Sequence, residues 1–286
     1  MKYGTRTLLV FILPGTLFLF AIALYPMVVA IRTSLFDLNW IVGGGEFVGL
    51  ANYASLATDA RLYGSIGRSC LHAGVSVFFH FLVGLGLALL LNRRIAGRGL
   101  FRGLLVVPWL LTPVVAATTW VLLYDPSLGL VRYLGALGVR SPLGNPNTSL
   151  MAISVTYIWK AFPLHMVMYL AGLQAIPHEL YEAAMMDGSG GFRTFLSITL
   201  PYLKGIILTV FLLDTIWTFR LFDFHYLMTE GGPMHSSEII PLYMYKVGFE
   251  RFQIGRAAAI GVVMFAILAL ICVFYLKYGF EEELAR

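Results

Sequence analysis

The chain alternates long runs of apolar residues with short polar segments. Six of these runs are about 20 residues long or more, which lets each cross the hydrocarbon core of a bilayer as a helix. They cover residues 8–31, 65–91, 103–124, 150–172, 203–227 and 257–279. The first run follows Lys2 and Arg6 as a signal peptide would, but it continues to Ile31, beyond the short core of such a peptide. The pattern predicts a single all-α membrane domain over 1–286 with six transmembrane helices.

The composition agrees with a membrane protein. Hydrophobic residues make up 59% of the chain and charged residues only 12%, whereas a soluble domain is roughly a quarter charged. The net charge of +5 therefore indicates loop arginines that face anionic lipid, and no nucleic-acid partner is expected. Cys70 and Cys272 lie in apolar runs far apart in sequence, so they indicate neither a disulfide framework nor a metal site.

The orientation follows from the loop after the second run. Short loops rich in arginine stay in the cytoplasm. This loop holds no acidic residue and four basic ones, Arg93, Arg94, Arg98 and Arg102. Six spans then place both termini in the cytoplasm, in agreement with Lys277 near the C-terminal end.

Three longer segments then lie outside the cell membrane, at 32–64, 125–149 and 228–256. In the first of them, Asn52 is a good N-cap for a short helix lying on the membrane surface. The third opens with a Gly-Gly-Pro turn and is rich in aromatic residues, which suits a docking surface for a solute-binding protein.

The polar segment between the fourth and fifth runs has the signals of a short, deliberately ended helix. Pro177 suits the first helical position, where a missing N–H has no partner to lose. Glu179 and Glu182 follow in the first turns, where the helix dipole favours negative charge. Gly188 accommodates the left-handed conformation that ends many helices. The segment 176–191 therefore predicts a helix of about three turns between two spans.

The same segment carries a family resemblance. Glu182, Ala183 and Ala184, then Gly188 four residues later, resemble the EAA loop of ABC-importer permeases, as do the residues Ile198, Leu200 and Pro201. Three further segments resemble the carbohydrate-importer branch, which includes the membrane subunits of the maltose transporter. They are FVGLANY at 47–53, GLGLALLLN at 84–92 and FRGLLVVPWLLTP at 101–113.

This resemblance implies a fold, a function and a set of partners. The fold is that of a type I ABC importer permease, with a cytoplasmic coupling helix in the loop 173–202. The chain is expected to be no enzyme and to hold no cofactor, because ATP and Mg²⁺ bind to two partner ATPase subunits. A second homologous permease and an extracytoplasmic solute-binding protein complete the assembly, which moves its solute by alternating access. The expected location is the inner membrane of a prokaryotic cell. The residues expected to couple to the ATPase are Glu182, Ala183, Ala184, Asp187, Gly188 and Phe192.

Charged residues within spans are candidates for a substrate path, because unpaired charge in hydrocarbon is expensive. The candidates, together with aromatic residues that suit stacking on sugar rings, are Trp159, Lys160, Asp214, Trp217, Arg220, Phe222 and Asp223. The alternative is structural: Arg220 pairs with Asp223, and Lys160 reaches a backbone carbonyl or Asp214. Both interpretations remain open for each residue.

Other polar positions favour packing roles. His72, His80 and His165 lie in apolar runs, where buried packing histidines are commoner than ligands. His178 and Glu179 begin like a zinc-protease helix, but Glu182 stands where that motif needs its second histidine. Close helix packing is expected at three small residues, Gly84, Gly86 and Ala88.

The pattern and the resemblance together predict one membrane subunit of an ATP-driven sugar importer. Three alternatives remain: an importer of a non-sugar solute such as polyamine or phosphate, an ion-coupled secondary transporter, and a scaffold without transport. A requirement for ATP and a binding protein separates the importers from the other two.

Overall fold

A computed structural model of the chain describes residues 5–41, 43–93, 95–134 and 141–279. The chain divides into two compact units. Unit 1 comprises Met1–Leu62 and Tyr243–Ile267, and unit 2 comprises Tyr63–Leu242 and Leu268–Arg286. The expectations that involve Lys2 and Arg94 concern positions outside the described residues.

Unit 1 contains the first long helix and a small hairpin. Its elements are α1 (Thr5–Thr33), β1 (Phe36–Asp37), β2 (Glu46–Phe47), α2 (Ala51–Leu56), η3 (Lys246–Glu250) and the first part of α13 (Ile254–Gly279). The two strands pair antiparallel, with Phe36 opposite Phe47 and Asp37 opposite Glu46. The phenyl rings of this first pair meet edge to face at 5.4 Å between centroids, which helps to hold the short hairpin together.

The N-cap expected at Asn52 is wrong. The helix α2 begins at Ala51, so Asn52 lies inside it. Its N-cap is Leu50, which makes no side-chain hydrogen bond there. The Asn52 side chain instead donates hydrogen bonds from Nδ2 to the carbonyl oxygens of Ser34, at 2.8 Å, and Phe36, at 3.0 Å. It thereby ties α2 to the segment that follows α1.

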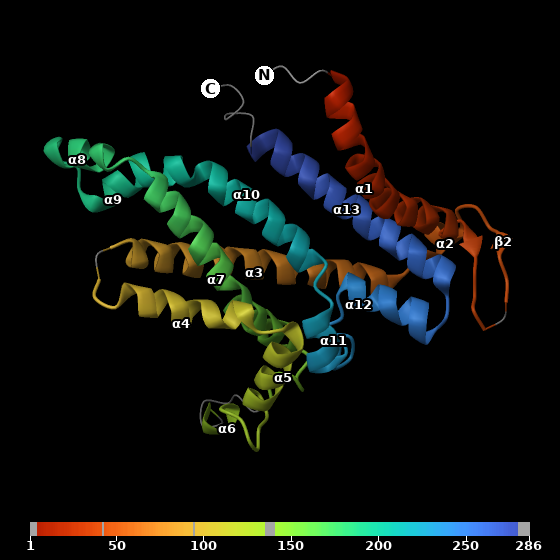
Figure 1. Cartoon of the computed structure of the whole chain (residues 1–286). Coiled ribbons are helices and arrows are strands. Elements are labelled where there is room, and N and C mark those ends of the chain that lie inside the picture. Colours follow the sequence, from red (N-terminus) through yellow and green to blue (C-terminus); the bar gives the residue numbers. More distant parts are fainter. Residues whose placement is uncertain (1–4, 42, 94, 135–140, 280–286) are drawn as a thin grey trace. The chain divides into compact units, whose positions relative to one another are not determined.

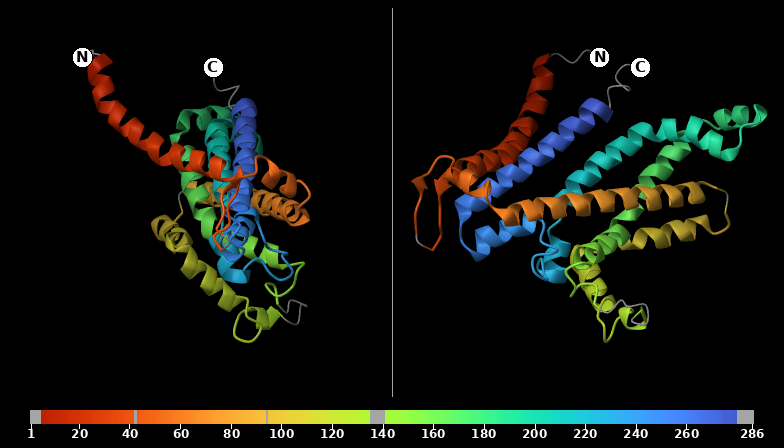
Figure 2. Two further views of the ribbon diagram at one scale, coloured as in Figure 1. Left: turned by 90° about the vertical axis from the view of Figure 1, so that its right-hand side faces the viewer. Right: turned by 180° about the vertical axis from the view of Figure 1, so that it is seen from behind.

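Unit 2 contains the remaining helices. They are α3 (Ala60–Asn92, from Tyr63 on), α4 (Arg98–Leu110), α5 (Pro113–Leu123), α6 (Val131–Leu134), α7 (Ser149–Ala175), α8 (His178–Met186), α9 (Gly191–Thr194), η2 (Phe195–Thr199), α10 (Leu200–Phe219), α11 (Asp223–Thr229) and the start of α12 (Ile240–Tyr245). In Figures 1 and 2, α8 and α9 lie together at one end of this unit, and α5, α6 and α11 lie at the other.

The described helices include five that are long and apolar enough to cross a membrane, or six if a bent pair counts as one span. The bent pair is α4 and α5, which meet at 95°. The expected unbroken span over 103–124 is therefore corrected. Pro113 explains the break, because a proline disfavours the helical conformation in the residue before it. Thr112 is accordingly extended, and its hydroxyl caps α5 by accepting a hydrogen bond from the Val115 N–H.

The fifth run is also divided. The helix α10 ends at Phe219, and a separate short helix, α11, begins at Asp223. The expected single helix over 203–227 is corrected, and Arg220 and Asp223 do not lie on one continuous helix. Tertiary packing explains the division: α11 buries Phe224 and Met228 in a cluster with residues of α5 and α7.

The main core of unit 2 lies where α3, α7 and α10 pack together. Two glycines permit their close approach. A Cβ on Gly84 of α3 would lie 2.6 Å from Cβ of His165 on α7, and one on Gly172 of α7 would lie 2.5 Å from Cδ1 of Ile206 on α10. Gly86, in contrast, has nothing within 4 Å of the corresponding position. The expected close helix contact is therefore confirmed at Gly84, and the same expectation is wrong at Gly86 within this subunit.

Candidate functional site

The helix α8 is short because both of its ends are fixed by local chemistry. Pro177 stands at the N-cap, one position earlier than expected. At the other end Gly188 takes φ +72°, which confirms the expected left-handed stop. The N–H of Ser189 donates to the Ala184 carbonyl at 2.9 Å, and that of Gly188 to the Met185 carbonyl at 3.1 Å. This is the Schellman pattern, which satisfies the last carbonyls of the helix.

The outer surface of α8 combines charge with exposed apolar side chains. Glu182 is 65% exposed, and its carboxylate lies 3.4 Å from Nδ1 of His178, which is exposed too. Ala183 and Asp187 are exposed as well, whereas Ala184 is buried inside the chain. Large apolar side chains are also exposed at Met185, Met186 and Phe192. Exposed apolar side chains gathered in one short segment favour a contact with another protein.

A second set of side chains anchors α8 to the long helices. Tyr181 and Phe195 pack against the core of α3, α7 and α10, and the Tyr181 hydroxyl lies 3.1 Å from the Thr199 hydroxyl. Phe192 and Leu196, on either side of Phe195, are exposed and take no part in this anchor. The anchor therefore comes from α8 itself and from η2.

Asp214, expected on a substrate path, lies in the core. Its side chain is 2% exposed and meets two histidines: Nδ1 of His80 at 2.8 Å and Nε2 of His165 at 3.1 Å, both from Oδ2. Thr218 donates a hydrogen bond to the other carboxylate oxygen, Oδ1, at 3.2 Å. The three spans α3, α7 and α10 thus meet at one buried polar cluster, which we call the His–Asp–His cluster.

The other candidates in the fourth span have structural partners. Lys160 donates a hydrogen bond from Nζ to the carbonyl oxygen of Trp109 at 2.8 Å, as the structural alternative anticipated. The rings of Trp159 and Trp120 meet edge to face at 5.6 Å. These contacts hold α7 against α4 and α5.

The candidates near the end of α10 point outward from the packed part of unit 2. Trp217 is about half exposed, and Arg220 and Asp223 are exposed. Within the described chain no ion pair joins Arg220 to Asp223, so the structural pairing considered for them is absent there. Phe222 stacks on Tyr226 at 5.1 Å between ring centroids. These residues differ from Asp214 in burial, because none of them is buried as its side chain is.

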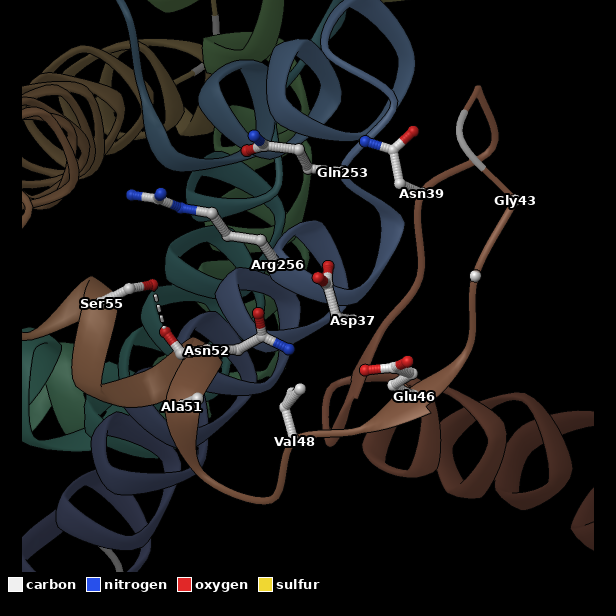
Figure 3. A pocket seen from close by; sticks show the side chains of 11 residues that line it. Asp37, Asn39, Gly43, Glu46, Val48, Ala51, Asn52, Ser55, Gln253 and Arg256 are labelled. Carbon is white, nitrogen blue, oxygen red and sulfur yellow. Dashed lines mark hydrogen bonds between the residues drawn. The ribbon is translucent and has the colours of Figure 1, made fainter.

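Unit 1 holds a polar pocket that the sequence did not suggest. Its volume is about 520 Å³, and Figure 3 shows the side chains around it. Asp37 and Glu46 face it from the hairpin, and Gln253 from the segment before α13. The Arg256 side chain extends away from Asp37 and pairs with Asp59 at 2.6 Å. Asparagine and acidic residues clustered between 37 and 52 were the signal available in the sequence.

Asp59 is the best-connected carboxylate of unit 1. The Tyr243 hydroxyl donates to it at 2.5 Å and the Arg256 guanidinium at 2.6 Å. Partial burial raises the pKa of the Asp59 carboxyl, but the hydrogen bonds from Tyr243 and Arg256 outweigh burial and hold that pKa below its usual value. Asp59 therefore joins α13 and α12 to the segment before α3 within this unit.

The long apolar helices define a multi-pass membrane protein, in which the short helix α8 lies exposed between two of them. The chain belongs to the family of binding-protein-dependent transport system inner membrane components, whose family model matches residues 80–284. This membership confirms the expected resemblance to importer permeases. The family is a transport permease family and not a family of enzymes.

Relatives match over most of the chain. The trehalose/maltose transport system permease protein MalF of Thermococcus litoralis is 38% identical, with 82% of this chain and 80% of the relative covered. The sulfoquinovosyl glycerol transport system permease protein SmoG of Agrobacterium fabrum is 34% identical, with 97% and 92% covered. These relatives confirm the expected kinship with permeases of carbohydrate importers.

Solved structures share the fold. A crystal structure of a bacterial ABC transporter involved in the import of the acidic polysaccharide alginate superposes with a TM-score of 0.81 at 23% identity, covering 95% of this chain and 94% of that one. A structure of the bacterial alginate transporter in complex with its alginate pentasaccharide-bound periplasmic protein gives the same score at 22% identity, covering 94% and 93%. The type I importer permease fold is therefore confirmed.

Proposed function

We propose that this chain is one of two membrane-spanning subunits of an ATP-driven, binding-protein-dependent importer for a saccharide or a saccharide-like solute. The observation that carries the proposal is whole-chain similarity to permeases named for trehalose/maltose and for sulfoquinovosyl glycerol. No loop in the sequence has the residues of a phosphate-binding motif, so ATP hydrolysis, with its Mg²⁺, falls to two partner ATPase subunits.

The helix α8 is the docking element for an ATPase subunit in this proposal. A groove of about 510 Å³ is lined both by Arg93 at the end of α3 and by Tyr181 and Met185 of α8. The arginine-rich loop and α8 thus lie on one side of the membrane, and the density of arginine makes that side the cytoplasm. Both chain termini are then cytoplasmic, as an even number of spans requires.

The helix α8 is connected to the spans in such a way that its movement displaces them. Its chain continues into α7 on one side and through α9 and η2 into α10 on the other. Because Tyr181 and Phe195 are packed into the core of α3, α7 and α10, a displacement of α8 shifts these spans and not only a loop. The spans then have two states, with the solute path open to one side of the membrane or to the other. The ATPase and the binding protein shift the equilibrium between these states, which is alternating access.

The solute path in this proposal lies along the exposed face near α10 and α11, where the second permease subunit closes it. Trp217 supplies an apolar ring for stacking on a pyranose, and Arg220 and Asp223 supply hydrogen bonds to hydroxyl groups. The extracytoplasmic binding protein delivers the solute to the opposite side of the membrane from α8.

Uptake by the reconstituted importer tests the proposal. First, saccharides, polyamines and phosphate are screened by calorimetry for binding to the solute-binding protein. The permease pair and its ATPase are then placed in proteoliposomes, with the binding protein outside and ATP inside. We expect a saccharide to bind and to enter only with both ATP and the binding protein. Uptake that needs an ion gradient instead of ATP, or a binding protein specific for polyamine or phosphate, would overturn it.

A further inference from the structure

The His–Asp–His cluster brings together three side chains that commonly bind metals. His80, His165 and Asp214 come from three different spans, and all are essentially inaccessible to solvent. The closest ligand atom of each residue lies within 4.8 Å of those of the other two. The sequence favoured simple packing for these histidines, so the convergence is a property of the fold alone.

In each histidine, the ring nitrogen that does not face Asp214, here called the outer nitrogen, lies near a backbone carbonyl oxygen. Nε2 of His80 lies 3.4 Å from the Tyr157 carbonyl oxygen, and Nδ1 of His165 lies 3.3 Å from the Ala161 carbonyl oxygen. A carbonyl oxygen only accepts, so both outer nitrogens are oriented to donate to it. When the outer nitrogens carry the hydrogens, the lone pairs of Nδ1 of His80 and Nε2 of His165 face Asp214, and a metal ion between them replaces the 2.8 Å hydrogen bond between Nδ1 of His80 and Oδ2.

The contact between His165 and Asp214 fits this assignment. Its atoms are 3.1 Å apart, yet Nε2 of His165 has no partner in hydrogen-bonding geometry. The two imidazole rings are stacked with centroids 4.8 Å apart. Among the described residues, no lysine or arginine contacts Asp214. One dication bonded to Oδ2 of Asp214, Nδ1 of His80 and Nε2 of His165 would balance the carboxylate charge and give Nε2 of His165 a partner.

The distances are close to those around a coordinated ion. Zinc bonds to imidazole nitrogen and to carboxylate oxygen are about 2.0–2.2 Å long, which places neighbouring ligands of a tetrahedral ion roughly 3.3–3.6 Å apart. The N–O separations here are 2.8 and 3.1 Å, so binding requires these side chains to move apart by roughly 0.5 Å. Backbone carbonyls behind both rings and the Thr218 hydroxyl behind the carboxylate are the outer contacts that orient metal ligands.

A fourth ligand position has an independent indication. The Tyr169 hydroxyl is fully buried and has no hydrogen-bond partner, and its ring lies 6.1 Å from that of His165. A buried hydroxyl without a partner is unfavourable in a protein interior. A water molecule completing the coordination of a metal at His165 would give this hydroxyl a partner.

We propose that His80, His165 and Asp214 bind one transition-metal dication, for which Zn²⁺ has the best-matched chemistry, and that this ion ties α3, α7 and α10 together. The ligand set of two imidazoles and one carboxylate excludes Mg²⁺ and Ca²⁺ as preferred ions, because these select oxygen. The role is structural and separate from the solute path.

Metal content measured on the intact, detergent-purified importer tests the site. We compare the wild type with His80→Gln, His165→Gln and Asp214→Asn after dialysis against a weak chelator, using elemental mass spectrometry. The matched control is His72→Gln, a buried histidine on the same face of α3 that bonds to Ser154 at 2.8 Å instead. We expect about one zinc per permease chain in the wild type and the control, and a loss of at least tenfold in the other three.

A second measurement keeps the test decisive if a variant misfolds. Stripping the wild type with a strong chelator should lower its Tm, and adding Co²⁺ should give the visible absorption of a tetrahedral site and restore the Tm. A wild type without transition metal, both as purified and after incubation with Zn²⁺ or Co²⁺, overturns the proposal. Equal metal content in His72→Gln and His80→Gln overturns it as well.

Discussion

The crossing of α3 and α7 gives the most direct quantitative prediction, because one methyl group tests it. In Gly84→Ala the new Cβ would lie 2.6 Å from Cβ of His165 and 3.1 Å from the Met166 nitrogen. Carbon atoms in contact are about 3.5–4.0 Å apart, so α7 must retreat by about 1 Å. Such overpacking costs about 1–3 kcal/mol. The substitution also gains about 1 kcal/mol of helix propensity, which partly hides this cost.

Gly86→Ala is the matched control, since it lies on the same helix and its Cβ meets nothing within 4 Å. The propensity gain is common to both variants, so the difference between them isolates the steric term. We expect Gly84→Ala to be less stable than Gly86→Ala by about 1–3 kcal/mol. The assay is unfolding of the isolated permease in mixed micelles by SDS titration, followed by tryptophan fluorescence. Equal stabilities would refute the close helix contact.

Three further predictions concern the other sites. Glu182→Gln should reduce retention of the ATPase subunit on a permease affinity column, whereas the control Glu179→Gln should leave retention unchanged. Equal effects of the two substitutions would mean that Glu182 only interacts with the helix dipole, a contribution under about 1 kcal/mol. Trp217→Ala should raise the solute concentration for half-maximal uptake by an amount worth about 1–3 kcal/mol, by analogy with stacking on other rings, and unchanged kinetics would remove it from the path. Asp59→Asn should destabilise the protein at neutral pH by about 1.5–3 kcal/mol, the scale of a hydrogen bond to a charged group. Folding lowers the pKa of Asp59, so its contribution to stability is fully present above the unfolded pKa of about 3.9 and is lost as the pH falls through the folded pKa. The difference in stability between the wild type and Asp59→Asn should therefore stay constant from about pH 6 to 8 and shrink only in acid.

The sequence was sufficient for the positions and order of the long apolar helices, because apolar runs of this length have few other uses. It was insufficient for where two of them break. The bend before Pro113 has a local cause that a stricter treatment of the residue preceding proline would have found. The end of α10 at Phe219 has none, because the run stays apolar and the division comes from the packing of α11 on α5 and α7.

The same distinction applies to the sites. The short helix α8 was predictable because its signals, Pro177 and Gly188, act within one turn of the chain. The His–Asp–His cluster joins residues up to 134 positions apart, which no local pattern relates. One signal did exist: polar side chains recur at helical spacing along the second apolar run, and the structure buries all of them. They are Ser65, Ser69, His72, Ser76 and His80. A polar stripe of this kind in a membrane helix indicates a face that is buried against protein.

The two sites of unit 2 bear on each other through the helices that they share. The helix α7 carries His165 and ends where α8 begins, and α10 carries Asp214 and starts where η2 ends. A push on α8 therefore reaches both helices at their ends on the α8 side, where their side chains are packed mainly by non-directional apolar contacts. Apolar contacts alone resist sliding weakly, since one close packing can be exchanged for another at small cost. A metal ion bonded to α3, α7 and α10 would fix their mutual register, so that the three helices respond to α8 as one body and not by sliding past one another.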